Sequence, residues 1–241
     1  MRPLLLLLFT VTLLASCRYV GGKRVRGNGN LTTSERSVSS FNGVSSFGSF
    51  DITLIPSSTA TVKVEADENL HEYIETYVDG GNLKIKTRNG YNLRPRRDIR
   101  VTVSGPTFNT IETHGSGSII SQGLLNANST SDVNLRVAGS GNIEVDLNAG
   151  GVDGEIAGSG NIKVRGKARV FEGDVMGSGN IRAADLETEE SKVEIAGSGN
   201  VEVYATNKLD VRVMGSGEVK HRGNARVNTK ITGSGSVVKM D

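Results

Sequence analysis

Five charged side chains recur at intervals of 18 to 20 residues, and their signs alternate roughly from one to the next: Glu144, Lys163, Arg182, Glu202 and Lys220. Carboxylates beside lysine or arginine on one exposed strand face are the groups that polysaccharide lyases and hydrolases use for acid–base chemistry. A column of alternating charge also forms a ladder of ion pairs on a solvated face. We favour the ladder, and a carbohydrate-active enzyme is the alternative.

Histidine and cysteine form no constellation that could do chemistry. His71, His114 and His221 have no neighbours at catalytic or metal-binding spacing, so we expect them on the surface or in a capping region. The sequence also lacks a nucleophile elbow, a His-x-x-x-His pair and a pair of cysteines. We therefore expect no catalytic residue, no metal site and no cofactor.

Two runs of like charge are further candidates for ligand binding. The basic run could hold an acidic glycan or a lipid headgroup, and it consists of Arg94, Arg96, Arg97 and Arg100. The acidic run could hold calcium, and it consists of Asp185, Glu187, Glu189 and Glu190. Because runs of like charge are usually solvated, we favour a solvated loop for the first and a solvated corner for the second.

The residues that must position these groups belong to a repeat. The triplet Gly-Ser-Gly occurs seven times, at spacings of 24, 19, 19, 20, 18 and 18 residues. A nearly fixed period indicates one small unit stacked on itself. The glycines of the triplets are Gly115, Gly117, Gly139, Gly141, Gly158, Gly160, Gly177, Gly179, Gly197, Gly199, Gly215, Gly217, Gly233 and Gly235.

Apolar and polar residues alternate on both sides of each triplet. Val193-Glu194-Ile195 precedes one triplet and Val201-Glu202-Val203 follows it. A period of two indicates strands with one buried face. We therefore expect an all-β fold, a right-handed parallel β-helix or solenoid with 18 to 20 residues per coil. Each strand would pair in parallel with its equivalent one coil away, at about 4.8 Å.

The glycines and the residue after them suit sharp corners between strands. Glycine adopts positive φ without a Cβ clash, and stacked corners leave no room for side chains. Four triplets are followed by an asparagine whose amide can bond to the next coil: Asn142, Asn161, Asn180 and Asn200. A phosphate-binding loop would need a helix after the glycines, and a calcium β-roll would need a regularly placed aspartate. Neither is present, so we interpret the triplets as structural corners.

The start of the chain has the pattern of an export signal. Arg2 precedes an apolar run, Leu4 to Leu14, that is too short to span a bilayer stably. The run ends in Leu14-Ala15-Ser16-Cys17, which resembles the bacterial lipobox, so residues 1–16 are predicted to be removed and Cys17 to carry lipid. Cys17 is the single cysteine, which excludes an internal disulfide.

The residues after Cys17 bear on where the protein resides. By resemblance to lipoprotein sorting, the absence of aspartate at Arg18 favours the outer membrane of a Gram-negative bacterium. Surface-export signals of Bacteroidetes lipoproteins are acidic near this point, whereas Lys23, Arg24 and Arg26 are basic. A periplasm-facing anchor is therefore favoured over an exposed one. The full chain has a net charge of +2, too balanced to predict a nucleic-acid partner.

Between the leader and the repeats, the pattern changes. Residues 17–35 are predicted to form a lipid-anchored tether, in which Val25 to Leu31 matches the repeat frame and could form an extra first coil. Residues 36–110 alternate as strands but lack the triplet, and are predicted to form an N-terminal β region or cap. Residues 67–77 are the one helix candidate, with Asp67 as its N-cap. Residues 111–241 form the repeat region.

Three features carry a resemblance to a known family: the repeated Gly-Ser-Gly-Asn-Ile, the segment Ala66-Asp67-Glu68-Asn69-Leu70 and the lipoprotein leader. In these features the chain resembles the head GIN domain family of autotransporter adhesins, which is abundant in Bacteroidetes. The resemblance covers about residues 36–240. It implies a right-handed parallel β-helix-like fold, and an adhesin function that itself derives from structural analogy.

These observations together predict a non-enzymatic envelope lipoprotein that acts as an adhesin-like binding or scaffold module. The alternatives are a carbohydrate-active enzyme of the lyase or hydrolase type and a structural envelope protein without a specific ligand. We expect the membrane as a partner through lipid on Cys17, a glycan or envelope protein along the flat face, and self-association through the ends of the repeat array.

Overall fold

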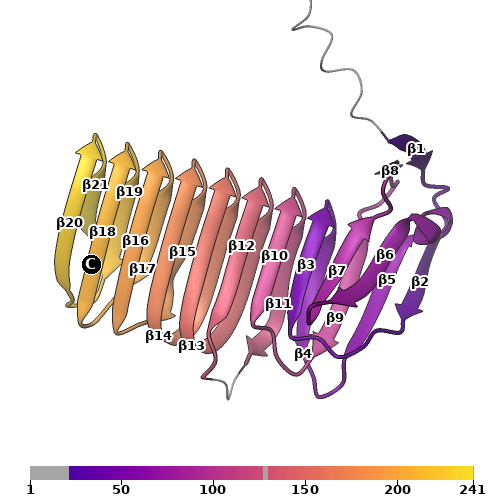
Figure 1. The fold of residues 1–241 in the computed structure, drawn as a ribbon, viewed down its shortest axis with the longest axis horizontal. Coiled ribbons are helices and arrows are strands. Elements are labelled where there is room, and N and C mark those ends of the chain that lie inside the picture. The colour runs from indigo at the N-terminus through magenta and orange to yellow at the C-terminus, as the bar shows by residue number, and fades with distance from the viewer. Residues whose placement is uncertain (1–21, 127–129, 241) are drawn as a thin grey trace, which may run out of the picture.

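The computed structural model describes residues 22–126 and 130–240, which form strands and a single 3-10 helix (Figure 1). The N-terminal elements are β1 (Lys23–Arg26), β2 (Leu31–Arg36), β3 (Gly43–Gly48), β4 (Asp51–Pro56), β5 (Thr61–Asp67), η1 (Glu68–Tyr73), β6 (Ile74–Asp79), β7 (Asn82–Thr87), β8 (Tyr91–Arg94) and β9 (Arg100–Gly105). The repeat region contains β10 (Thr110–Gly115), β11 (Ser118–Leu125), β12 (Val133–Gly139), β13 (Asn142–Gly158), β14 (Asn161–Gly177), β15 (Asn180–Glu187), β16 (Glu190–Gly197), β17 (Asn200–Tyr204), β18 (Lys208–Gly215), β19 (Glu218–Arg222), β20 (Arg226–Gly233) and β21 (Ser236–Lys239).

Nineteen of the strands form one sheet, which folds over onto itself and encloses a single core. We call one side face A; its strands, in spatial order, are β7, β3, β10, β12, the second halves of β13 and β14, β16, β18 and β20. The other side is face B; its strands are β9, β4, β11, the first halves of β13 and β14, β15, β17, β19 and β21.

The prediction of a right-handed parallel β-helix is wrong. The sheet is mixed: β2 and β9 pair antiparallel with β5, and β6 pairs antiparallel with β7. Gly-Ser-Gly corners join the faces along one edge, while β13 and β14 continue from face B to face A along the other, so the sheet is barrel-like and nearly closed. All of the antiparallel pairs that the structure describes lie in the N-terminal region, which lacks the triplet. At Gly80 and Gly81, which have φ of +58° and +81°, the turn is a hairpin.

The predicted helix over residues 67–77 is also wrong. Glu68–Tyr73 makes only a 3-10 turn, and the chain continues as β6. The physical reason is the β-branched content of β6, with Ile74, Thr76 and Val78, together with the free edge of β7 that it pairs with. Asp67 gives no side-chain cap to this turn.

Asp67 instead holds the N-terminal segment. Its Oδ1 accepts a hydrogen bond from the backbone N–H of Gly29 at 2.7 Å, and its Oδ2 accepts one from the backbone N–H of Arg96 at 2.8 Å. A Cβ on Gly27 would lie 1.9 Å from Oδ2. The segment Val25 to Leu31 therefore does not add a coil to the main sheet; β1 pairs with β8 in a separate two-stranded sheet.

In the repeat region, equivalent residues stand in register. Ile143, Ile162 and Ile181 are neighbours on adjacent strands, and each is at most 1% exposed. Burial of such a side chain contributes about 1.5–3 kcal/mol, and one strand pair alone could not shield it. The column of aliphatic residues thus makes each repeat depend on its neighbours.

The corners leave no volume for side chains. Gly177 has φ of +128°, and a Cβ there would lie 2.4 Å from the carbonyl oxygen of Gly158, its equivalent one repeat earlier. At the second glycine of the same triplet, Gly179, a Cβ would lie 2.6 Å from both the carbonyl oxygen of Gly160 and Cγ2 of Ile156. Backbone contact between corners therefore requires glycine at both places.

The strands farthest from the N-terminal region, β20 and β21, are largely exposed (Figure 1). Ile231 on β20 is 40% exposed, although its equivalents one and two repeats earlier are buried. Self-association through the edge formed by β20 and β21 stays a prediction.

None of the helices among the described residues has the length and apolar character to span a bilayer.

The corner geometry predicts the effect of adding one methyl group. We expect Gly177→Ala to lower the free energy of unfolding by about 3 kcal/mol or more, because positive φ and a backbone clash act together. Denaturant unfolding monitored by circular dichroism measures the change.

The matched control is Gly80→Ala, at a positive-φ position where a Cβ would meet nothing within 4 Å. Positive φ alone costs alanine about 1–2 kcal/mol, so we expect a loss of that size. Equal losses in the two variants would show that φ alone, and not the stacked backbone, determines the requirement for glycine.

Candidate binding surface

The charge column singled out from the sequence lies on face B. Its five members occupy equivalent places on adjacent strands: Glu144, Lys163, Arg182, Glu202 and Lys220. Glu144 lies 3.0 Å from Nζ of Lys163 and 3.0 Å from Nη1 of Arg165. Hydrogen bonding to Lys163 is the main cause of the lowered pKa of Glu144. A carboxyl held ionised in this way is a poor proton donor, so its geometry suits an ion-pair ladder better than acid catalysis.

The four asparagines after the triplets also lie on face B and are joined through their side chains. Asn161 donates to Asn142 at 2.8 Å, Asn180 donates to Asn161 at 3.0 Å, and Asn200 donates to Asn180 at 3.0 Å. The backbone N–H of Glu218 donates to Oδ1 of Asn200 at 3.3 Å and continues the series. The amides are thereby engaged with one another along the row.

The basic run does not converge on one site. Nε of Arg96 donates to the carbonyl oxygen of Gly27 at 3.2 Å, which fixes the N-terminal segment. Arg100 lies 3.4 Å from Glu65 on β5. Arg94 ends β8, opposite Arg26 on β1, and Arg97 is exposed in the loop that follows β8. At least two of the four arginines therefore serve contacts within the fold.

The acidic run likewise diverges. Asp185 lies 3.4 Å from Arg222, and Glu187 lies 3.2 Å from Lys167. Glu189 and Glu190 are exposed at the start of β16. Among residues 22–126 and 130–240, no group of three or more histidine, cysteine, aspartate or glutamate residues is placed to hold a metal ion.

The three histidines occupy unrelated places. Nε2 of His71 lies 3.1 Å from the carbonyl oxygen of Thr32, and the ring of His114 stacks on Phe47 with centroids 4.6 Å apart. His221 differs from the expected surface or cap position, because it is buried on β19, and burial lowers its pKa. Cys17, the predicted lipid-attachment residue, lies outside the described residues.

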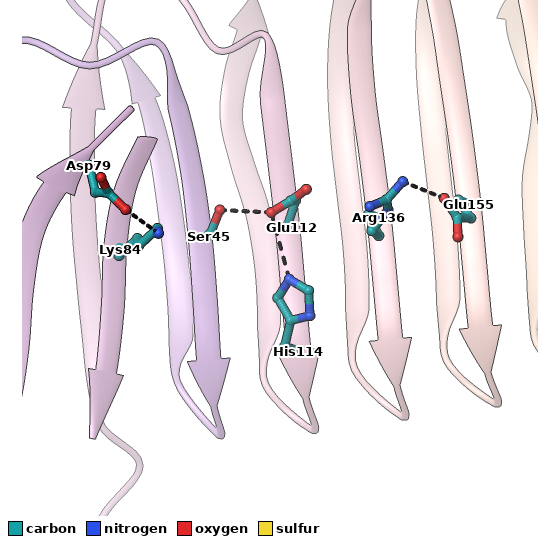
Figure 2. A network of polar contacts seen from close by, with 7 residues as sticks. All are labelled: Ser45, Asp79, Lys84, Glu112, His114, Arg136 and Glu155. Atoms are coloured by element: carbon teal, nitrogen blue, oxygen red, sulfur yellow. Dashed lines mark hydrogen bonds and ion pairs between the residues drawn. The ribbon is translucent and has the colours of Figure 1, made fainter. Parts of the chain in front are cut away.

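Face A carries polar side chains that are largely neutralised at its N-terminal end. Figure 2 shows Ser45 donating a hydrogen bond to Glu112 at 2.8 Å, with His114 3.6 Å from the same carboxylate. Arg136 on β12 lies 2.6 Å from Glu155 on β13 (Figure 2). On the strands that follow Glu155 along face A, carboxylates stand beside other carboxylates.

We call five carboxylates on β13, β14 and β16 the acidic row: Asp153, Glu155, Glu172, Asp174 and Glu194. Like charges are direct neighbours in three pairs, Asp153–Glu172, Glu155–Asp174 and Asp174–Glu194. Directly opposed like charges destabilise a sheet. In the same columns farther along, opposite charges are neighbours, for example Glu194 and Arg212. Arg212 and Lys230 form a like-charged pair of positive sign, so the acidic row is the part of face A where negative charges are direct neighbours.

Two members of the acidic row, Asp153 and Asp174, form no ion pair with another described residue. Glu172 and Glu194 share Lys192, at 3.9 Å and 3.2 Å, and Glu194 also lies 3.2 Å from Arg212. No ion pair or hydrogen bond engages the carboxyl groups of Asp153 and Asp174 in the part of the chain that the structure describes. Partial burial, followed by the neighbouring carboxylates, raises the pKa of both above the usual 3.8.

An exposed apolar strip borders the acidic row. We call Met176, Ala196 and Met214 the methionine row; they occupy equivalent places on β14, β16 and β18. The two methionines are 52% and 50% exposed. Because alanine stands between them, they flank a hollow of about 380 Å³ that Glu155, Asp174 and Glu194 border. Apolar surface and carboxylates thus meet in one depression.

Sequence reasoning missed this surface, although the repeat contains the signal for it. One period of 19 residues separates Asp153 from Glu172 and Glu155 from Asp174. That spacing places like charges side by side wherever strands pair in register. The candidates chosen from the sequence were instead the charge column, which lies on face B, and two runs of like charge near strand ends, whose members do not converge.

The electrostatics predict that the acidic row lowers stability at neutral pH. A carboxyl with a raised folded-state pKa favours folding when protonated, and this contribution disappears as pH rises through that pKa. We therefore expect Asp174→Asn to raise Tm at pH 7 by about 1–3 °C, and to change it little near pH 3, where the carboxyl is protonated in both states. Differential scanning calorimetry measures both values.

Glu144→Gln is the control with the opposite sign. Its folded-state pKa is lowered, so its contribution is present at pH 7 and lost on acidification. We expect its Tm at pH 7 to fall. A lower Tm for Asp174→Asn at pH 7 would contradict the assignment of Asp174 as an unpaired, unfavourable charge.

Comparison with known proteins places the chain in a family. Residues 40–225 match the family described as "Putative auto-transporter adhesin, head GIN domain". A crystal structure described as a putative lipid binding protein, from Parabacteroides distasonis, is 32% identical, with a TM-score of 0.76 over 91% of this chain and 100% of that one. A putative adhesin from the same species is 26% identical, with a TM-score of 0.71 over 90% of this chain and 100% of that one.

A putative adhesin from Bacteroides fragilis has the same fold, with a TM-score of 0.82 at 21% identity over 90% of this chain and 100% of that one. No curated protein matches the chain. The family match spans more than half of the sequence and agrees with the resemblance seen in its motifs. This chain therefore belongs to the head GIN domain family.

Proposed function

We propose that this chain is an adhesin-like binding module of the bacterial envelope, which holds a macromolecular partner on face A and performs no catalysis. The observation that carries the proposal is the acidic row beside the methionine row. Like charges in register and half-exposed methionines both lower the stability or solubility of an isolated fold. Such features persist where a surface has a function that offsets the cost.

The described functions of the relatives agree with this proposal at a coarse level. The family is described as adhesin-like, and solved relatives are described as an adhesin or a lipid-binding protein. None of these descriptions names an enzymatic reaction. Binding by an extended face is also what a long sheet supports geometrically, since its strands lie side by side (Figure 1). Their register places equivalent outward residues in rows.

The test incorporates a photo-crosslinking residue into this protein and is carried out in intact cells. With p-benzoylphenylalanine in place of Ala196 on face A, illumination of intact cells should yield a discrete adduct of higher mass. The same residue in place of Glu202 on face B is the matched control and should yield little. Adducts of equal intensity from both faces, or none from Ala196, would contradict binding through face A.

The alternative is a carbohydrate-active enzyme that uses the acidic row. Asp174, with its raised pKa, is the group that favours it. The full chain is therefore incubated with a panel of acidic and neutral polysaccharides, and new reducing ends are measured. Release of reducing ends that Asp174→Asn abolishes would overturn the non-enzymatic proposal.

The anchor is a further part of the proposal. Lipid on Cys17 would hold the module at the outer membrane, facing the periplasm, as the leader and the basic residues after it suggest. We expect Cys17→Ser to move most of the protein from the membrane fraction to the soluble fraction on cell fractionation. Retention of the variant in the membrane fraction would exclude lipid on Cys17 as the anchor.

A further inference from the structure

The geometry points to an extended basic segment of a partner protein as the occupant of face A. Its lysine or arginine side chains would lie with their aliphatic stems in the methionine row and their charged ends at Asp174 and the neighbouring carboxylates. This inference rests on the proposed function, because it names the class of partner for the same surface.

The charges on the surface determine the sign of the partner. Three pairs of like-charged neighbours lie within the acidic row, and the ion pairs of Lys192, Arg136 and Arg212 with this row go to Glu155, Glu172 and Glu194. Asp153 and Asp174 form no ion pair among the described residues, and the more distant Lys192 and Arg136 only partly offset the repulsion on them. A cation placed beside Asp174 would also lie between Glu155 and Glu194, which occupy the equivalent places on the neighbouring strands. Positive charge from outside would relieve the repulsion within the row.

The methionine row determines the shape of the group that carries the charge. Met176 and Met214 are separated by two strand spacings, about 10 Å, with the small side chain of Ala196 between them. An aliphatic stem fits in this trough, and methionine side chains adapt to the groups that they contact. Asp174 and Glu194 stand two residues before the methionine row on the same strands, about 7 Å away. Lysine and arginine combine an apolar stem with a charged end at about this distance.

Other positively charged or apolar ligands fit less well. Carboxylates in a row on adjacent strands stand side by side instead of converging on one point, and none of the described residues form a metal-binding group. The same carboxylates repel the phosphate groups of an anionic lipid surface. A basic peptide satisfies both the charge and the apolar strip.

The probe is hexalysine labelled with a fluorophore, and binding to the full chain in detergent is followed by fluorescence anisotropy. We expect hexalysine to bind with an affinity that falls as salt is added. Hexalysine acetylated on every Nζ keeps the stems but loses the charges, and it should not bind measurably.

Two variants test the two halves of the surface. Asp153→Asn combined with Asp174→Asn removes the two carboxylates that form no ion pair with the described residues, and it should weaken hexalysine binding on the order of tenfold. Met176→Ser combined with Met214→Ser should weaken it several-fold, although the charge is unchanged. The control on face B is Glu202→Gln combined with Glu218→Gln, which removes the same charge and should change the affinity by less than about twofold.

The outcomes separate this inference from the proposed function. Equal affinity of wild type and the Asp153/Asp174 variant, or displacement of hexalysine by calcium through tighter binding at the same carboxylates, would overturn the inference. An unchanged affinity in the methionine variant would reduce the site to nonspecific charge attraction and overturn it too. If cells still give the adduct from position 196 while hexalysine fails to bind, the proposed function stands and only the partner class is wrong. Circular dichroism and Tm establish that each variant is folded.

Discussion

The structure depends on the close approach of one backbone corner to the next. At each Gly-Ser-Gly triplet, the carbonyl oxygen of the preceding corner occupies the space where a Cβ would stand, as at Gly177 above Gly158. This contact fixes the strand register across the faces, because the corner of one repeat must stand directly over the corner of the next. Register then determines which side chains are neighbours, both in the core and on the surface.

In the core, register produces columns of aliphatic residues that no single repeat could bury. On the surface it produces rows, and these rows have different character on the two faces. Face B joins asparagine to asparagine and places Glu144 between Lys163 and Arg165, so its rows stabilise themselves. Face A places Asp174 between Glu155 and Glu194, with exposed methionines alongside. The same geometric constraint thus yields a linked asparagine row and paired carboxylates on face B, although Lys163 and Arg182 are like-charged neighbours there, and a row of adjacent negative charges on face A.

The antiparallel pairs lie in the N-terminal region. At Gly80–Gly81 the chain turns through a hairpin and β6 pairs antiparallel with β7, whereas β3 and β4, which Gly48 joins without the full triplet, still pair in parallel with β10 and β11. Asp67, which the sequence suggested as a helix cap, instead ties Gly29 and Arg96 together through backbone N–H groups. The mixed sheet that results is nearly closed and barrel-like instead of a uniform parallel helix.

From the sequence alone, the period of the glycine triplets and the alternation around them determined that the fold is all-β and which residues, such as Ile143 and Ile162, are buried. These properties follow from local φ preferences and from side-chain alternation, both of which are written in neighbouring residues. The antiparallel pairing of β5 with β2 and β9, the pairing of β6 with β7 and the role of Asp67 were decided only by the tertiary structure. Each depends on residues far apart in the chain meeting across the sheet, and local patterns do not specify which strand edge is free to receive them.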